Sequence, residues 1–150
     1  MSEPVCQSVY SHRTVLVTGA QGFIGQHTCA RLVSAGAIVH TVSRRSVPNL
    51  PGTRQSHQVD LGRADDVARL IDSVKPDYVF HLASHVSGSR AIEEVGPTFD
   101  SNLASTVHLL RCITGTNCRR IVLAGSLEES TDTAPSSPYA AAKSAASMTR

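Results

Sequence analysis

The sequence lacks the features that mark membrane, secreted and disulfide-rich chains. No apolar run approaches the roughly 20 residues that a membrane-spanning helix requires, so we expect no membrane span. The opening segment MSEPVCQSVYSHR contains an acid and a proline and no apolar core, which is unlike a secretory signal. No C-x-x-C spacing occurs, which favours reduced thiols and a cytoplasmic location. The cysteines are Cys6, Cys29, Cys112 and Cys118.

An excess of charge of one sign is also missing. The 14 Lys and Arg outnumber the 12 Asp and Glu by only two, and they are scattered, so we expect neither nucleic acid nor a membrane surface as partner. The chain has 150 residues, 41% of them apolar and 17% charged, which excludes a disordered or collagen-like protein. We expect a short tail over residues 1–12 and one core-forming domain over residues 13–150.

Short apolar runs alternate with helical patterns along the chain. Strands are predicted at Thr14–Thr18, Ile38–Val42, Ser56–Val59, Tyr78–Ala83 and Ile121–Ala124. Helices are predicted at Gly22–Ala35, from Asp60 to Pro76, at Thr98–Ile113, and from Pro138, with Ser137 as its cap. The prolines of Ser46–Gly52 make that segment a loop. The alternation predicts an α/β fold with a Rossmann-like parallel sheet, flanked by helices, in the strand order 3-2-1-4-5.

Three glycines follow the first predicted strand directly and open the first helix. Gly19 permits a tight turn, Gly22 lets the backbone approach a pyrophosphate, and Gly25 lets the helix pack closely on the sheet. The free N–H groups and the positive dipole end of the helix then attract an anion. In this strand–turn–helix context the motif predicts a dinucleotide site.

The end of the second strand indicates which dinucleotide is bound. An acidic residue there would bind ribose hydroxyls and repel a 2′-phosphate, but the sequence has Ser43-Arg44-Arg45. A guanidinium binds phosphate through two parallel N–H bonds, so the expected cofactor is NADP, with NAD as the alternative. Asp60, after the third strand, is expected to accept a bond from adenine, to cap a helix, or to do both.

Tyr139 and Lys143 lie four residues apart at the start of the last helix, so they share one helix face. A lysine beside a tyrosine favours the phenolate, which suits Tyr139 to exchange a proton with an alcohol. The pair alone is common by chance. Its place after the fifth strand, thirteen residues beyond Ser126, favours a catalytic role.

At this point the sequence resembles the extended short-chain dehydrogenases/reductases, which are NAD(P)-dependent nucleotide-sugar epimerases, dehydratases and reductases. The resemblance covers residues 13–150. It rests on TGAQGFIG (18–25), VDL (59–61), HLAS (81–84), VSGSRAIEE (86–94), Asn102, AGSLEE (124–129) and SPYAAAK (137–143).

The resemblance implies roles for single residues. Tyr139 would be the acid/base, Lys143 would tune it and hold the nicotinamide ribose, Ser126 would bond the reacting sugar oxygen, and Asn102 would support the lysine through water. The remaining residues would contact the cofactor. They are Gly19, Gly22 and Gly25 at the pyrophosphate, Phe23 and Ile24 through their backbone, Ser43, Arg44, Asp60 and Leu61 around the adenosine end, Ala83 along the channel, and Ser89 at the nicotinamide or sugar end.

The class of reaction stays open between reductase, epimerase and dehydratase. Dehydratases of the family follow Ser126 with an acid pair, whereas this chain has Leu127, which cannot donate a proton, and then Glu128 at the position of the family's glutamate base. The Ser126–Tyr139 segment is shorter than is usual for the family, and the usual Tyr-Gly pair is missing. Both departures affect the sugar pocket.

A second hypothesis is a non-catalytic NADP(H)-binding fragment or regulator, because a C-terminal substrate lobe is expected in the family and not in these 150 residues. By resemblance only, a homodimer would form through Thr98–Ile113 and the final helix. No metal site is expected. His81 and His85 are four apart, but on a strand end and a loop, and His81 is expected to be a packed residue that orients the adjacent turn.

Overall fold

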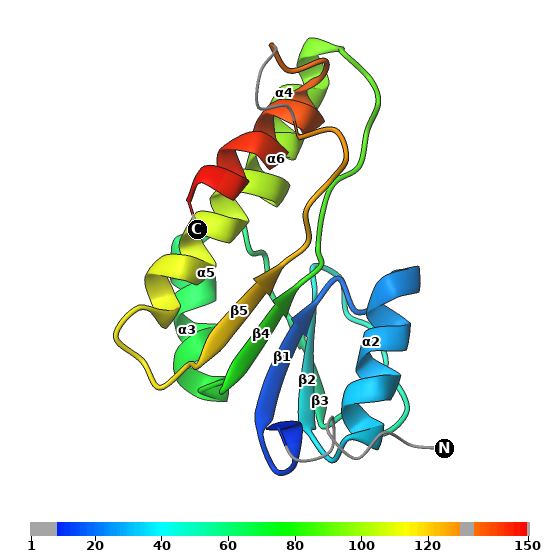
Figure 1. Ribbon diagram of the computed structural model, residues 1–150, viewed down its shortest axis with the longest axis vertical. Helices are drawn as coiled ribbons and strands as arrows, with labels where there is room; N and C mark the ends of the chain where they lie inside the picture. The colour runs from blue at the N-terminus through cyan, green and yellow to red at the C-terminus, as the bar shows by residue number, and fades with distance from the viewer. Residues whose placement is uncertain (1–8, 130–133, 150) are drawn as a thin grey trace.

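Five parallel strands form the centre of the computed structural model, which describes residues 9–129 and 134–149. The sheet order is β3-β2-β1-β4-β5, as predicted (Figure 1). Strands β2 and β3 lie on one side of β1, and β4 and β5 lie on the other. Such a change of side leaves a crevice at the carboxyl ends of the central strands. The strands are β1 Thr14–Thr18, β2 Ile38–Ser43, β3 Gln55–Gln58, β4 Tyr78–His81 and β5 Arg120–Leu123.

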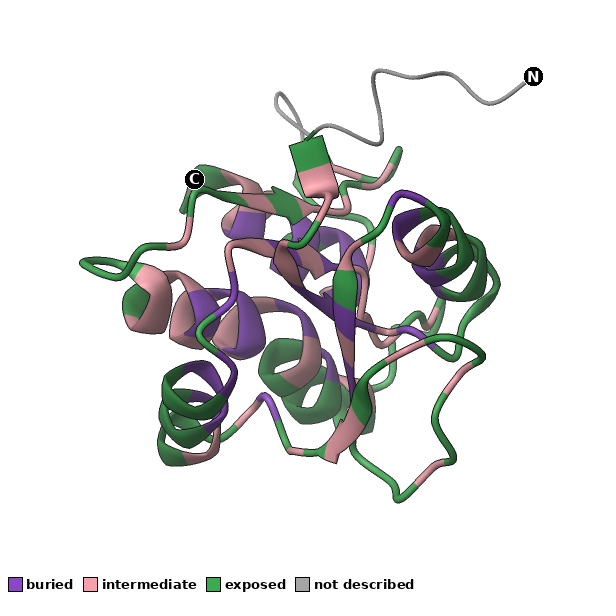
Figure 2. Ribbon diagram, turned by 90° about the horizontal axis from the view of Figure 1, so that it is seen from below, coloured by how far each residue is buried: buried purple, intermediate pink, exposed green. Residues whose placement is uncertain are grey.

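Helices cover both faces of the sheet. Helix α2 (Phe23–Ser34) packs on one face against Val15, Val17 and Val39. Helices α3 (Ala64–Val74) and α5 (Ser105–Ile113) lie on the other face (Figure 1). Figure 2 shows the buried positions in the strands and on the helix sides that face them. A strand buried on both faces explains why the three central residues of Thr14–Thr18 are all apolar.

The stretch predicted as one helix at Thr98–Ile113 is helical throughout but begins earlier. It comprises a 3₁₀ turn η1 (Ile92–Glu94), α4 (Val95–Thr98), a π-helical segment η2 (Phe99–Ala104) and α5. Its fully buried positions are mainly polar, whereas its apolar stripe stays partly exposed. The buried residues are Thr98, Asn102, Ser105, Thr106 and Leu109; the stripe is Phe99, Leu103, Val107 and Leu110.

The last helix, α6 (Pro138–Met148), begins as predicted. The Ser137 side chain accepts a hydrogen bond from the Ala140 N–H at 3.1 Å, and Pro138 occupies the first turn. The role of Asp60 as a helix cap was wrong. Helix α3 begins at Ala64 after Arg63, with no side-chain cap, and Asp60 instead closes a local turn by accepting from the Gly62 N–H at 3.0 Å.

Within the described residues, no helix combines the length and the apolar character that crossing a bilayer requires. The predicted loop at Ser46–Gly52 contains no strand.

Candidate functional site

The glycine turn lies between the end of β1 and the start of α2. Gly19 has a φ of +68°, and a Cβ there would lie 2.6 Å from the Ala83 backbone nitrogen, so only glycine fits. A Cβ on Gly25 would lie 2.2 Å from the Gly19 carbonyl oxygen. Gly22 differs, because its Cβ position meets only the Gly19 oxygen at 3.4 Å and is otherwise open. Two glycines are therefore required by packing, and the third presents bare backbone to the space in front.

That space is a cavity of about 310 Å³ at the carboxyl edge of the sheet. Its walls come from the glycine turn, the ends of β2 and β3, the segment after β4, and the π-helical segment. The predicted cofactor residues on it are Gly19, Gly22, Ser43, Arg44, Asp60, Leu61 and Ala83. The other lining residues are Gln21, Val42, Val59, Gly62, Leu82, Ser84 and Ser101.

The other predicted cofactor residues lie outside this lining: Phe23, Ile24 and Gly25 at the glycine turn, Ser89 after β4, and Tyr139 and Lys143 on α6. Gly25 is buried beneath the turn, while Phe23 and Ile24 are 81% and 67% exposed. Their backbone belongs to the first turn of α2, where N–H groups have no partner within the helix.

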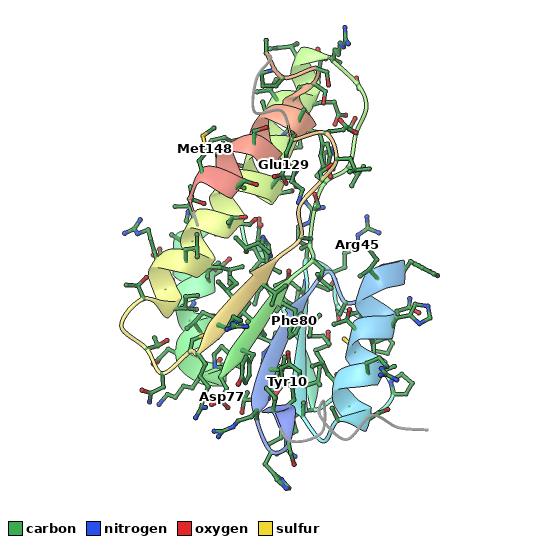
Figure 3. All side chains as sticks on the ribbon, viewed as in Figure 1. Tyr10, Arg45, Asp77, Phe80, Glu129 and Met148 are labelled. Atoms are coloured by element: carbon green, nitrogen blue, oxygen red, sulfur yellow. The ribbon has the colours of Figure 1, made fainter. Side chains whose placement is uncertain are left out.

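The end of β2 is polar and accessible. Arg44 is exposed, and the Ser43 hydroxyl accepts from the Arg45 N–H at 3.2 Å. Figure 3 labels Arg45 at this edge, near the start of α2. The Asp60 turn lies across the cavity at the end of β3, and in the described residues no donor reaches its Oδ2.

Asn102 holds the segment that leaves β4. Its Oδ1 accepts from the Ser84 hydroxyl at 3.0 Å and from the His85 N–H at 2.7 Å, and its Nδ2 donates to the His85 carbonyl at 2.9 Å. The amide thus pairs with the His85 backbone in both directions. This anchor lies next to Ala83 and Ser84, which line the cavity.

His81 is buried in the sheet and bonds two elements. Its Nδ1 lies 2.8 Å from the Thr18 hydroxyl, and its Nε2 lies 3.2 Å from the Ser105 hydroxyl. Burial, together with the positive charge of Lys143, lowers the pKa of His81 to about 4, so the imidazole is neutral. As expected from the sequence, His81 is a packed residue that holds the turn after β4.

His85 does not share the partners of His81. Its Nε2 lies 2.7 Å from the Glu94 carboxylate. That hydrogen bond is the largest of the effects on the Glu94 carboxyl, and it lowers the pKa of Glu94. Ser89 lies on the same exposed segment, where its hydroxyl accepts from the Ala91 N–H. Among the described residues, no three His, Cys, Asp or Glu side chains gather as a metal site would need.

Lys143 and Tyr139 are both buried on α6, at 8% exposure each. The Lys143 ammonium donates to the Ala124 carbonyl oxygen at 2.7 Å, just beyond the end of β5. Lys143 and Asn102 also line one small cavity of about 10 Å³, which is about the space that a single water requires.

The turn after β5 carries Ser126. Its hydroxyl accepts from the Glu128 N–H at 3.2 Å, while the Glu128 side chain is exposed. Glu129, to which the sequence-based prediction gave no role, is half-buried, and its Oε1 accepts from the Ser126 N–H at 2.8 Å. The Ser-x-x-Glu spacing at 126–129 is a capping-box pattern, which is the signal that could have identified it.

The comparisons with known proteins agree with this geometry. The model of the NAD dependent epimerase/dehydratase family matches residues 15–149. A UDP-glucose 4-epimerase from Mycolicibacterium smegmatis is 32% identical over an alignment that covers 85% of this chain and 47% of that protein. One from Pisum sativum is 30% identical over 79% of this chain and 38% of that protein.

Solved structures give the same result. The chain superimposes on a Thermus thermophilus UDP-glucose 4-epimerase complexed with NAD with a TM-score of 0.76, at 26% identity, over 91% of this chain and 49% of that chain. It therefore spans about half the length, or less, of these relatives. The family match over nearly all of its residues agrees with the motifs and with the fold, so the chain belongs to the NAD dependent epimerase/dehydratase family.

Proposed function

We propose that the chain forms the cofactor-binding and proton-transferring part of a nucleotide-sugar oxidoreductase of epimerase, reductase or dehydratase type. The observation that carries this proposal is the cavity at the carboxyl edge of the sheet, because seven residues that the sequence nominates for a dinucleotide line it. Membership of the family and the UDP-glucose 4-epimerase relatives support a nucleotide sugar as substrate.

The cavity fits part of a dinucleotide in size and in chemistry. Its volume of about 310 Å³ lies at the lower end of the range for small-molecule sites. The open Cβ position of Gly22 leaves room for a pyrophosphate to reach the backbone, beside the N–H groups of Phe23 and Ile24. The carboxylate of Asp60 is suited to accept from the adenine amino group, with Leu61 and Ala83 as apolar walls.

The exposed Arg44 beside Ser43 supports NADP as the cofactor. A guanidinium and a hydroxyl are suited to a 2′-phosphate, and no acidic side chain stands at the end of β2 to repel one. NAD, the cofactor bound in the Thermus thermophilus structure, is the alternative.

The proposed chemistry divides between the cofactor and the side chains. The nicotinamide, when bound, supplies or accepts the hydride. Tyr139 exchanges the proton of the sugar oxygen, and Ser126 donates a hydrogen bond to that oxygen. Lys143, held by the Ala124 carbonyl, stabilises the phenolate and holds the nicotinamide ribose, with Asn102 supporting it. Exposed Glu128 enters only the dehydratase form of the proposal, as the base that helps remove water.

Tyr139→Phe tests the proposal, because it removes the proton-transferring hydroxyl and keeps the ring. With a panel of nucleotide sugars that begins with UDP-glucose, we expect hydride transfer, followed by nicotinamide absorbance, to fall about a hundredfold or more. The calorimetric Kd for NADPH should change less than about twofold. Hydride transfer retained by the variant would contradict the role of Tyr139. A wild-type chain that binds NADPH but turns over no sugar would favour the non-catalytic alternative.

A further inference from the structure

We propose that Glu129 is a positioning residue, whose carboxylate ties the turn that carries Ser126 to the helix that carries Tyr139 and Lys143. Figure 3 labels Glu129 where the segment after β5 lies against α6. The inference rests on the proposed function, since it gives Glu129 a part in the same reaction. Glu129 acts through the groups that it holds, and not by contact with substrate.

On the side of the turn, Glu129 closes a compact loop on Ser126. Its Oε1 accepts from the Ser126 N–H at 2.8 Å, and its own N–H donates to the Ser126 carbonyl at 3.3 Å. The Ser126 hydroxyl accepts from the Glu128 N–H at 3.2 Å, an arrangement that leaves the hydroxyl proton directed elsewhere. The carboxylate therefore fixes the backbone from which the catalytic hydroxyl projects.

On the side of the helix, Glu129 reaches the stripe that carries the other two groups. Its Oε2 accepts from the Ser147 hydroxyl. Tyr139, Lys143 and Ser147 follow one another at spacings of four, so they share one face of α6. Side-chain hydrogen bonds thus join the segment after β5 to this face, among them Lys143 to the Ala124 carbonyl and Glu129 to Ser147.

Burial and charge distinguish Glu129 from its neighbour. Glu128 is exposed, whereas Glu129 is half-buried and lines the cavity of about 10 Å³ together with Lys143. A carboxylate and an ammonium on the walls of one small cavity offset part of the cost of removing each from water. An acid that interacts only with solvent is not expected to line such a cavity.

The consequence concerns alignment of the reacting groups. Ser126 and Tyr139 must reach the same sugar oxygen, and a displacement of about 1 Å in such a pair costs about a hundredfold in rate. The Glu129 carboxylate bonds both the turn and α6 directly. Loss of the carboxylate should therefore lower kcat more than it raises KM.

The contact is tested by NMR, without any activity measurement. An amide proton bonded to a carboxylate shifts when that carboxylate is protonated, so the Ser126 amide should follow an acidic titration in the wild-type chain. Glu129→Gln should abolish this titration. Glu128→Gln, which removes the same charge one residue away, should keep it. A Ser126 amide that titrates unchanged in Glu129→Gln would overturn the proposal.

The positioning role is tested on the cofactor-loaded chain. Glu129→Gln should lower kcat about ten- to a hundredfold, with KM and the NADPH Kd within about twofold. Ser147→Ala removes the other end of the link and should lower kcat in the same direction, and the double variant should be no worse than Glu129→Gln, because the two act as a unit. Asp72→Asn, an exposed acid on α3, is the control with wild-type kinetics.

The outcomes separate the two proposals. A wild-type kcat in both Glu129→Gln and Ser147→Ala overturns the positioning role, and Ser147→Ala decides alone where Glu129→Gln fails to fold. A chain in which Tyr139→Phe keeps full hydride transfer while Glu129→Gln loses kcat overturns the proposed role of Tyr139 and leaves the link in place. A chain that binds NADPH without any turnover favours the non-catalytic alternative, and the NMR titration then decides whether the link exists.

Discussion

His81 joins three segments at the carboxyl edge of the sheet through hydrogen bonds that run in one direction. The Ser105 hydroxyl donates to the Ser101 carbonyl, so it accepts from the Nε2–H of His81. The Nδ1 of His81 then accepts from the Thr18 hydroxyl, whose oxygen accepts from the Ala83 N–H. A neutral imidazole satisfies every bond, and protonation at Nδ1 would remove an acceptor and place a charge beside Lys143.

Stability should therefore fall in acid. The pKa of His81 is about 4 in the fold and about 6.5 when unfolded, so between these values only the unfolded chain takes the proton. The free energy of unfolding should fall by up to about 1.4 kcal/mol for each pH unit below 6.5, or about 3 kcal/mol in all. Burial also lowers the pKa of His40 and His57, which adds in the same direction.

Urea unfolding between pH 7 and pH 4.5 measures this effect. His81→Gln should be less stable at pH 7 and should show a flatter dependence on pH. His12→Asn, at an exposed position whose φ of 58° asparagine tolerates, should keep the wild-type slope. Equal slopes in His81→Gln and wild type would exclude His81 as the source.

Arg44 decides between the two dinucleotides in our account. Arg44→Asp replaces a phosphate-binding cation by an anion, so the Kd for NADPH should rise about a hundredfold, while that for NADH changes less than about threefold. Arg45→Asp is the matched comparison, because Arg45 does not line the cavity, and its effect should be smaller. If Arg44→Asp lost the same affinity for NADPH as for NADH, the assignment of NADP as the cofactor would be wrong.

The residues that sequence reasoning missed depend on contacts made far along the chain. Glu128 and Glu129 are identical in type, and only the turn after β5 directs one outward and the other toward Ser147 on α6. Asn102 was named by resemblance, but its pairing with the His85 backbone requires β4 and η2 to be side by side. The local Ser-x-x-Glu pattern could have indicated the bond of Glu129 to Ser126, but no local pattern indicates its contact with Ser147 or the pairing of Asn102 with His85.

At the scale of elements, two glycines of the same turn have different surroundings: Gly25 is required by packing, and Gly22 lies at the proposed binding cavity. A Cβ added to Gly25 would overlap the Gly19 carbonyl oxygen, whereas Gly22 lines the cavity. Gly22 also has ordinary extended backbone angles, which alanine adopts without strain. Substitutions at these two positions should therefore have different consequences.

Gly25→Ala should destabilise the fold by about 2 kcal/mol or more, because its Cβ would overlap backbone atoms that cannot move independently. Gly22→Ala should leave the unfolding midpoint close to wild type. It should weaken NADPH binding about tenfold or more, because in our proposal the added methyl group would stand where the pyrophosphate approaches the backbone. Thermal unfolding and calorimetry of both variants check this. If the Gly22→Ala variant bound NADPH with wild-type affinity, the pyrophosphate could not lie against Gly22.

The elements themselves were largely predictable. Apolar runs located β1, β2, β4 and β5 to within two residues, and Ser137-Pro138 located the start of α6. The third strand, predicted one residue later than observed, is polar and has no such run. The π-helical segment η2 was not predictable from a local pattern. Asn102 in η2 and Ser105 at the start of α5 are buried, and they bond Ser84, His85 and His81. The apolar period of Phe99, Leu103, Val107 and Leu110 marked the other side of the helix.

At the scale of the whole molecule, topology explains why the nominated residues meet. Parallel strands place the ends of β1, β2, β3 and β4 at one edge, so motifs separated by up to about sixty residues line one cavity. The strand order followed from the alternation of elements and from right-handed crossovers. The chain matches about half of each relative or less, so the sugar, the partner and the assembly belong to the proposal.

Calorimetric titration of the wild-type chain with NADPH tests the central claim most directly, namely that the cavity at the carboxyl edge of the sheet binds a dinucleotide. We predict saturable binding at one site per chain, tighter for NADPH than for NADH and weakened by Gly22→Ala. The absence of saturable binding for both dinucleotides, or binding that Gly22→Ala leaves unchanged, would contradict it.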